Sequence, residues 1–112
     1  MATGKYDDGE TDSQQYKGGI ELAGFGVFEQ QTMTVVKKIV GNVVDKLEKK
    51  CLKYESLSIH VKTIHEREKG ELYELSFKLI DNGKLYNCET TDRNIQFALG
   101  DGLRKIEKMI SK

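Results

Sequence analysis

Two histidines and two glutamates near the middle of the chain have the side chains best suited to metal or acid–base chemistry: His60, His65, Glu66 and Glu68. The two histidines lie an odd number of positions apart, so in a strand they would point to opposite faces. The chain contains neither a Cys-x-x-Cys nor a His-Glu-x-x-His motif, the spacings typical of zinc sites. We therefore expect an exposed strand histidine followed by a solvated loop, and no metal site.

The residues that could supply a nucleophile or hold a phosphate do not form a recognisable motif. Cys51 and Cys88 lie far apart, and the serines belong to no triad signature. The segments GFG (24–26) and GDG (100–102) are isolated, and neither GxxxxGK[ST] nor GxGxxG occurs. We expect no enzymatic activity and no cofactor. The cysteines are predicted to be reduced, mostly buried thiols of an intracellular protein, with a disulfide as the alternative.

Composition limits the remaining classes of function. The 112 residues, of which 38% are hydrophobic, suit one domain with a modest core. Lysine and arginine number 18, as do aspartate and glutamate, so any site for a polyanion has to be local. No apolar run approaches the roughly 18 residues that a membrane span needs, and there is no signal segment. We expect a cytoplasmic protein without a membrane partner.

The predicted domain begins at Ile20. Residues 1–19 are polar and hold almost nothing that could anchor a core, so we expect a disordered tail that ends at the glycine pair 18–19. Residues 20–112 form the single domain. Its first strand is expected within GIELAGFGVF (19–28), with Phe25 and Val27 continuing the apolar face and the glycines permitting a bend.

Two segments show the apolar spacing of amphipathic helices. In the segment 30–54 the core positions are Val36, Val40, Val43 and Leu47, and Thr32 or Thr34 is the expected N-cap. The second helix is expected to start at Asp92 or Asn94. Its inward stripe is Ile95, Leu99, Leu103, Ile106 and Ile110. Phe97 lies off this stripe, and we predict that it packs at the end of the sheet; exposure to a partner is the alternative.

Three further strands lie between the helices. SLSIHVKTI (56–64) and LYELSFKLI (72–80) alternate apolar and polar residues, and KLYNCET (84–90) follows Asn82-Gly83, a strong hairpin signal. The predicted fold is α+β with the order β-α-β-β-β-α. It has a four-stranded mixed sheet and two helices packed on one face, with the first two strands parallel and the last three antiparallel.

Basic residues project from the polar sides of both predicted helices. On the first helix Lys37, Lys38 and Lys49 lie away from the apolar arc, and on the second Arg104, Lys105 and Lys108 do the same. If the helices lie side by side, these residues share one outer surface and could bind a polyanion. Because acidic residues are interspersed, ordinary solvation of two helices explains the same pattern.

Two RNA-binding folds with similar element content fit less well. The RNA-recognition motif needs aromatic residues on its open sheet face, whereas Tyr73 and Phe77 share a face with Leu75 and Leu79. The double-stranded RNA-binding domain begins with its helix, but here a strand precedes it. A third alternative is a small cytosolic module of the same architecture whose helices bind a protein or whose sheet edges dimerise.

The element order and three segments together resemble the ribosome hibernation-promoting factor family, also called ribosome-associated inhibitor or protein Y. The segments are KLEK (46–49), IDNGKLYNCET (80–90) and ALGDGLRKIEKMI (98–110). In that family the second helix typically begins with Asp, followed by Ala-Ile or Ala-Leu and a segment like Lys-Leu-Glu-Lys. Here Asn94 takes the place of the Asp, and 105–108 that of the last segment. The resemblance covers about residues 20–112.

The resemblance implies a protein that sits in the messenger and transfer RNA channel of the small ribosomal subunit and silences idle ribosomes. Basic residues on the outer surface of the helices bind rRNA in that family. Carried over by position, the candidates are Lys37, Lys38, Lys46, Lys49, Arg104, Lys105 and Lys108, with Arg93, Lys50 and Lys112 at the margins. The missing C-terminal dimerising domain corresponds to a short form, which we expect to be a monomer or weak dimer when free.

Overall fold

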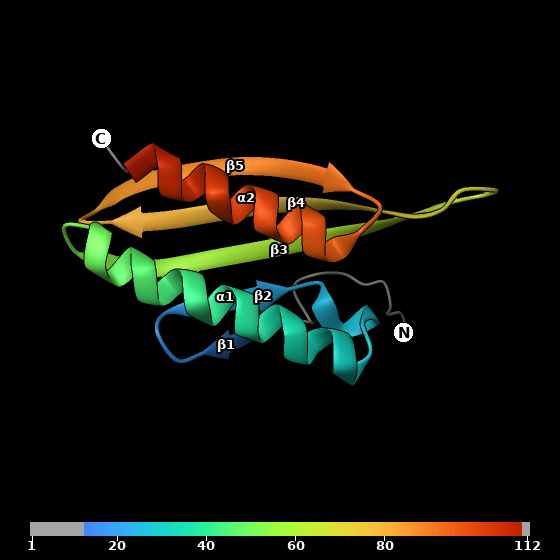
Figure 1. The fold of residues 1–112 in the computed structure, drawn as a ribbon, viewed down its shortest axis with the longest axis horizontal. Coiled ribbons are helices and arrows are strands. Elements are labelled where there is room, and N and C mark those ends of the chain that lie inside the picture. The colour runs from blue at the N-terminus through green and yellow to red at the C-terminus, as the bar shows by residue number, and fades with distance from the viewer. Residues whose placement is uncertain (1–12, 111–112) are drawn as a thin grey trace.

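The computed structural model describes residues 13–110, which form a mixed sheet covered on one face by two helices (Figure 1). The elements follow the order β1 (Gln14–Tyr16), β2 (Ile20–Ala23), a 3-10 turn (Phe25–Val27), α1 (Gln30–Lys50), β3 (Tyr54–Glu66), β4 (Gly70–Asp81), β5 (Lys84–Asp92) and α2 (Ile95–Ile110). The strands lie in sequence order across the sheet. Strands β2 and β3 are parallel, and every other neighbouring pair is antiparallel.

The prediction of an α+β fold with two helices and a mixed sheet is confirmed, but the number of strands is wrong. The sheet has five strands because Gln14–Tyr16, which we expected in a disordered tail, pairs antiparallel with β2. The order is therefore β-β-α-β-β-β-α. This strand has no apolar alternation; it is held by backbone pairing, which side-chain patterns do not reveal, and by Tyr16, which packs against the core. Residues 1–12 of the expected tail lie outside the described residues.

The first predicted strand is also shorter than expected. It ends at Ala23, and Phe25–Val27 forms the 3-10 turn. Gly24 causes this break because its φ is 82° and a Cβ there would overlap the carbonyl oxygen of Val61. Phe25 is consequently buried, whereas Val27 is exposed.

The starts of the two helices differ from each other in their capping. Helix α1 begins at Gln30, and its N-cap Glu29 makes no side-chain cap bond, so the predicted threonine cap is wrong. The Thr34 hydroxyl instead donates to the Gln30 carbonyl at 3.0 Å. Helix α2 has the predicted cap, because the side-chain oxygen of Asn94 accepts hydrogen bonds from the amides of Gln96 at 2.9 Å and Phe97 at 3.1 Å.

One core lies between the helices and the sheet. Four α1 residues, among them Val36 and Leu47, and the α2 stripe around Leu103 pack on the alternating apolar residues of β2, β3 and β4. Helix α2 comes close to the sheet at Gly102, directly over the fully buried Phe77. A Cβ at position 102 would overlap the Phe77 ring. The close packing of α2 on β4 therefore depends on glycine at this position.

The two helices run side by side in the same direction, so both C-terminal ends lie at the same end of the molecule (Figure 1). The Lys50 ammonium and the Glu107 carboxylate, 3.4 Å apart, join these ends. The adjacent β4–β5 hairpin turns through Asn82 and Gly83, both with positive φ, as the Asn-Gly signal predicts. At the opposite end the β3–β4 hairpin extends beyond the helices (Figure 1). None of the described helices is long and apolar enough to cross a membrane.

Candidate nucleic-acid interface

Three lysines of α1 lie on the side of the helix that faces away from the sheet. Lys38, Lys46 and Lys49 are exposed, and within residues 13–110 they form no ion pair. Their positions follow from the burial of Val36, Val40, Val44 and Leu47, which fixes the rotation of the helix about its axis. Because Leu47 is buried, its neighbours on the polar side point to solvent.

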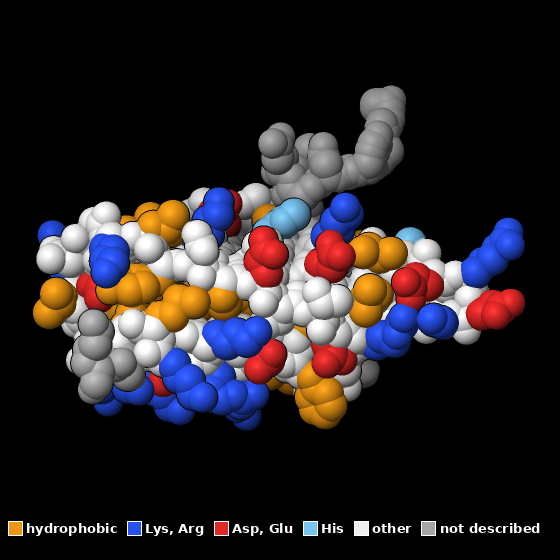
Figure 2. All heavy atoms as spheres, turned by 90° about the horizontal axis from the view of Figure 1, so that it is seen from above, with side chains coloured by type: hydrophobic (Ala, Val, Ile, Leu, Met, Phe, Trp, Pro, Cys, Tyr) orange, Lys and Arg blue, Asp and Glu red, His pale blue; other side chains and the backbone are white. Residues whose placement is uncertain are grey.

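Helix α2 contributes two basic residues to the same side of the molecule. Arg104 and Lys108 are exposed on the face opposite the buried stripe. Arg104 lies 3.9 Å from Asp101, a distance that allows only a weak ion pair at an exposed site. Figure 2 shows Lys and Arg side chains gathering over the C-terminal half of α2, on the helix side of the molecule. We call Lys38, Lys46, Lys49, Arg104 and Lys108 the basic helix face.

Two other candidates lie at the flanks of this face. The Lys37 ammonium sits 5.1 Å above the ring of Tyr16, so this side chain leans toward β1. Lys105 leans toward β5 and lies 3.8 Å from Asp101. Both are exposed and could reach a large ligand, but each already has a partner that partly satisfies its charge.

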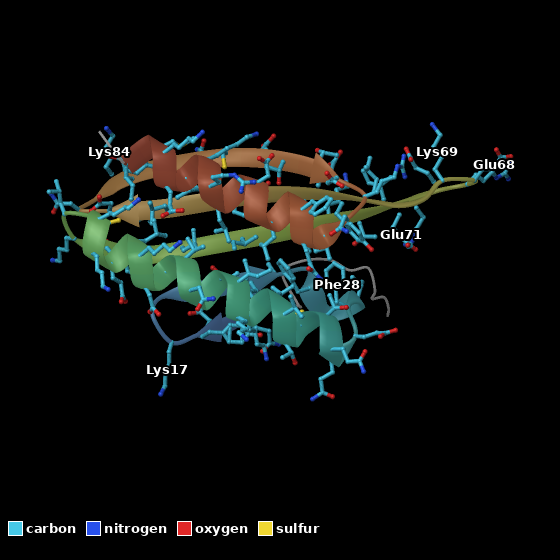
Figure 3. All side chains as sticks on the ribbon, in the orientation of Figure 1. Lys17, Phe28, Glu68, Lys69, Glu71 and Lys84 are labelled. Atoms are coloured by element: carbon cyan, nitrogen blue, oxygen red, sulfur yellow. The ribbon has the colours of Figure 1, made fainter. Side chains whose placement is uncertain are left out.

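Arg93 does not join the basic helix face. It follows β5, and its guanidinium pairs with Glu66 and donates to the carbonyl oxygens of Lys69 at 3.2 Å and Glu71 at 3.5 Å. Arg93 therefore fastens the turn end of the β3–β4 hairpin to the segment that precedes α2. The labelled tip residues Glu68 and Lys69 point away from the body of the protein (Figure 3). Of the marginal candidates, Lys50 is engaged with Glu107 and Lys112 lies outside the described residues.

The open face of the sheet has a different character. Its two shallow hollows, of about 380 and 230 Å³, share Ser76 and Lys78 and are lined mainly by polar side chains. The aromatic residues Phe77 and Tyr73 point to the other face, where Tyr73 packs against Phe28 with ring centroids 5.4 Å apart. Phe28 lies under the start of α1 (Figure 3). Among residues 13–110, the open face thus lacks the stacking residues that the RNA-recognition motif uses.

The cysteines are held as protonated thiols. Burial, with the nearby Asp81 carboxylate as the next cause, raises the pKa of Cys51 to about 11. Burial also raises the pKa of Cys88, whose thiol donates to the Gly102 carbonyl at 3.5 Å. Both are free thiols, and a thiol that stays protonated is a poor nucleophile. Among residues 13–110, no three His, Cys, Asp or Glu side chains gather in a way that could hold a metal ion.

Phe97 is the surface residue whose environment we predicted wrongly. We expected it to pack at the end of the sheet, but 68% of its surface is exposed. The sequence did indicate this exposure, because Phe97 lies off the apolar stripe by which α2 packs on the sheet. The position of Phe97 on the helix therefore predicts its environment better than its hydrophobicity does.

No protein-family model and no curated protein sequence matches this chain.

Proposed function

We propose that this protein is a ribosome-associated factor that binds rRNA of the small subunit through its basic helix face and occludes the channel for messenger and transfer RNA. The proposal joins the sequence resemblance to the hibernation-promoting factor family with one structural observation. That observation is that Lys46 and Lys49 on α1 and Arg104 and Lys108 on α2 are exposed near the C-terminal ends of two helices that run side by side in the same direction (Figure 1).

The parallel arrangement of the helices favours a nucleic-acid ligand. Because both C-terminal ends meet at the Lys50–Glu107 pair, basic residues far apart in the chain become neighbours. Three of them, Lys46, Lys49 and Lys108, form no ion pair within the described part of the chain. When unpaired lysines bind RNA phosphates, they release the cations that were condensed on the RNA. This release is often the dominant source of affinity for RNA. The mechanism is steric, and no bond is made or broken.

The test is co-sedimentation with purified small ribosomal subunits at increasing salt. We expect log K to fall with log salt by about 0.7–0.9 for each phosphate that is neutralised. The triple variant Lys38→Glu, Arg104→Glu, Lys108→Glu should bind at least about tenfold more weakly, because each reversal removes one attraction and adds one repulsion. Absent binding, or binding that does not respond to salt, would overturn the proposal.

A matched control carries similar changes on the open face of the sheet. Lys62 and Lys78 are exposed there, on strands β3 and β4. The double variant Lys62→Glu, Lys78→Glu is compared with the double variant Arg104→Glu, Lys108→Glu, which changes the net charge equally. We expect the control to retain most of the affinity of the wild-type protein. Equal loss in both variants would mean that net charge, and not the basic helix face, determines binding.

A further inference from the structure

Phe97 is exposed in a part of α2 that is firmly fixed. Its amide donates to the side chain of the N-cap Asn94 at 3.1 Å, and Asn94 in turn donates its own amide to Asp92 at 2.9 Å. The two following residues, Ala98 and Leu99, are fully buried. The backbone that carries the Phe97 ring is therefore held in place although the ring itself is left in solvent.

A glycine one turn further along leaves the space beside Phe97 open. Nothing lies within 4 Å of a Cβ added at Gly100, and its φ is not in the left-handed region. Packing thus explains why residue 102 is a glycine, because the Phe77 ring leaves no space for a side chain there. It does not explain why residue 100 is a glycine. Glycine weakens a helix interior. The one local consequence of Gly100 that we see is a surface without a side chain between Phe97 and Arg104.

These residues form a hollow of about 430 Å³ on the outer side of α2. Its lining residues are Asp92, Gln96, Phe97, Gly100, Asp101 and Arg104. One wall is an aromatic ring, the floor is Gly100, and the far rim is a guanidinium. Asp101 lies 3.9 Å from Arg104 and 3.8 Å from Lys105, so two cations offset its charge.

We propose that this hollow binds one unpaired RNA nucleotide, with the base stacked on Phe97 and a phosphate held by Arg104. Amino groups on the base edge would donate to the Asp101 carboxylate or the Gln96 side-chain oxygen. Stacking on aromatic side chains is the usual way in which proteins hold single-stranded bases. The inference rests on the proposed function for the source of the RNA, but its test does not depend on that function.

The lining favours a nucleotide over an apolar segment of a protein. Of the lining residues within 13–110, Phe97 alone has a large apolar side chain, and the others are polar or charged except for the glycine. An apolar peptide would bury the Gln96 amide without a partner and would take the charges of Asp101 and Arg104 out of water without new hydrogen bonds, which is costly. A nucleotide offers a flat ring to Phe97, hydrogen-bond donors to the acidic rim and a phosphate to Arg104.

The chain contains five tyrosines but no tryptophan, so Phe97→Trp introduces a single tryptophan, which can be excited selectively, at the proposed stacking position. The probe is a mixed-sequence RNA hexamer, compared with the same ribose–phosphate chain with all bases removed. We expect the hexamer to quench the tryptophan and the abasic chain to leave it largely unchanged. The control Leu85→Trp, at an exposed position on β5, should show no difference between the two chains.

Affinity measurements on two further variants complete the test. Phe97→Ala and Gly100→Gln should each bind the hexamer about tenfold more weakly, the first through loss of stacking and the second because its side chain fills the hollow. Both should bind the abasic chain like the wild-type protein. Phe97 is exposed and Gly100 has free space around it, so both variants should fold, and circular dichroism checks this.

The outcomes separate this inference from the proposed function. Equal binding of the hexamer and the abasic chain, or a hexamer affinity that Phe97→Ala leaves unchanged, would overturn the nucleotide site. Failure of the wild-type protein to bind the hexamer would do the same. Tight binding of an apolar peptide that Phe97→Ala abolishes, without base-dependent RNA binding, would show a protein docking site instead. In each case co-sedimentation with small subunits judges the proposed function separately.

Discussion

At the scale of single residues, the two glycines of GDG have opposite effects on stability. Gly102→Ala places a Cβ much closer to a carbon of the buried Phe77 ring than van der Waals contact allows, so the ring or α2 has to shift, and we expect a loss of about 3 kcal/mol. Gly100→Ala meets no neighbour within 4 Å and should stabilise the protein by about 0.5–1 kcal/mol through helix propensity. Urea unfolding of both variants measures this difference. Equal effects would contradict the close approach of α2 to Phe77.

Cys51 links stability to pH on the alkaline side. An unfolded cysteine has a pKa near 8.5, whereas the folded pKa is about 11, so the folded state retains the thiol proton to higher pH. Its contribution to stability is therefore complete below about pH 8.5 and is lost as pH rises toward 11. Tyr54, whose pKa burial raises to about 12, acts in the same direction at higher pH.

The measurement is the urea midpoint of the wild-type protein and of Cys51→Ala between pH 7 and 10.5. We expect the wild-type midpoint to fall more steeply with pH above about 8.5, because the variant lacks the group that resists ionisation. Alkylation of Cys51 by iodoacetamide should also be slow at pH 8 and accelerate when the protein is unfolded. Parallel pH profiles for the two proteins would contradict the raised pKa.

At the scale of elements, Asp81 joins the end of α1 to the β4–β5 hairpin. Its buried carboxylate accepts from the amides of Lys53 at 2.8 Å and Leu52 at 3.3 Å, and the Asn82 amide donates to the Lys53 carbonyl at 2.8 Å. We expect Asp81→Ala to cost about 2–3 kcal/mol, because two amides lose a charged acceptor. Asp81→Asn keeps one acceptor oxygen and should lose less. Chemical denaturation compares the two, and an effect below about 0.5 kcal/mol for Asp81→Ala would contradict this role.

How well the sequence predicts an element depends on whether side chains or backbone hold it. Strands β3 and β4 and both helices show strong apolar periods, because each buries one face against the core. Strand β1 is three residues long and exposes Gln14 and Gln15, so apart from Tyr16, which packs against the core, its support is the backbone pairing with β2. The same limit applies to the hairpin tip, where β3 continues to Glu66 and β4 begins at Gly70, within the charged segment 65–71 that we expected to be a solvated turn or loop.

The candidate site was predictable in its residue types and less so in its arrangement. The helical period places Lys38, Lys49 and Arg104 on outer surfaces, as the structure has them. It does not reveal that Lys37 leans toward Tyr16 or that Arg93 reaches the β3–β4 hairpin. Both contacts come from segments distant in the sequence, and they depend on β1 and on a hairpin longer than expected.

At the scale of the whole molecule, residues 13–110 should unfold as one unit. Both helices pack on a single core cluster that includes residues of β2, β3 and β4, so neither helix can leave without exposing the sheet. We expect coincident urea transitions by circular dichroism at 222 nm and by tyrosine fluorescence. An earlier transition in either signal would show that part of the fold opens independently.

The parallel direction of α1 and α2 also has an electrical consequence. Helix dipoles that point the same way add, whereas antiparallel neighbours would cancel, and their negative ends coincide beside Lys46, Lys49 and Lys108. The opposite end holds the hairpin, where Glu66, Glu68 and Glu71 are largely offset by Arg67, Lys69 and Arg93. Since the molecule is 43 Å long and the Debye length is about 8 Å at physiological salt, each end acts as a separate charge. The two helix ends carry about half a negative charge each, so they reduce the charge of these lysines without cancelling it. A protein with a formal net charge of zero would therefore rotate as it approaches a polyanion, so that its lysine-rich end arrives first.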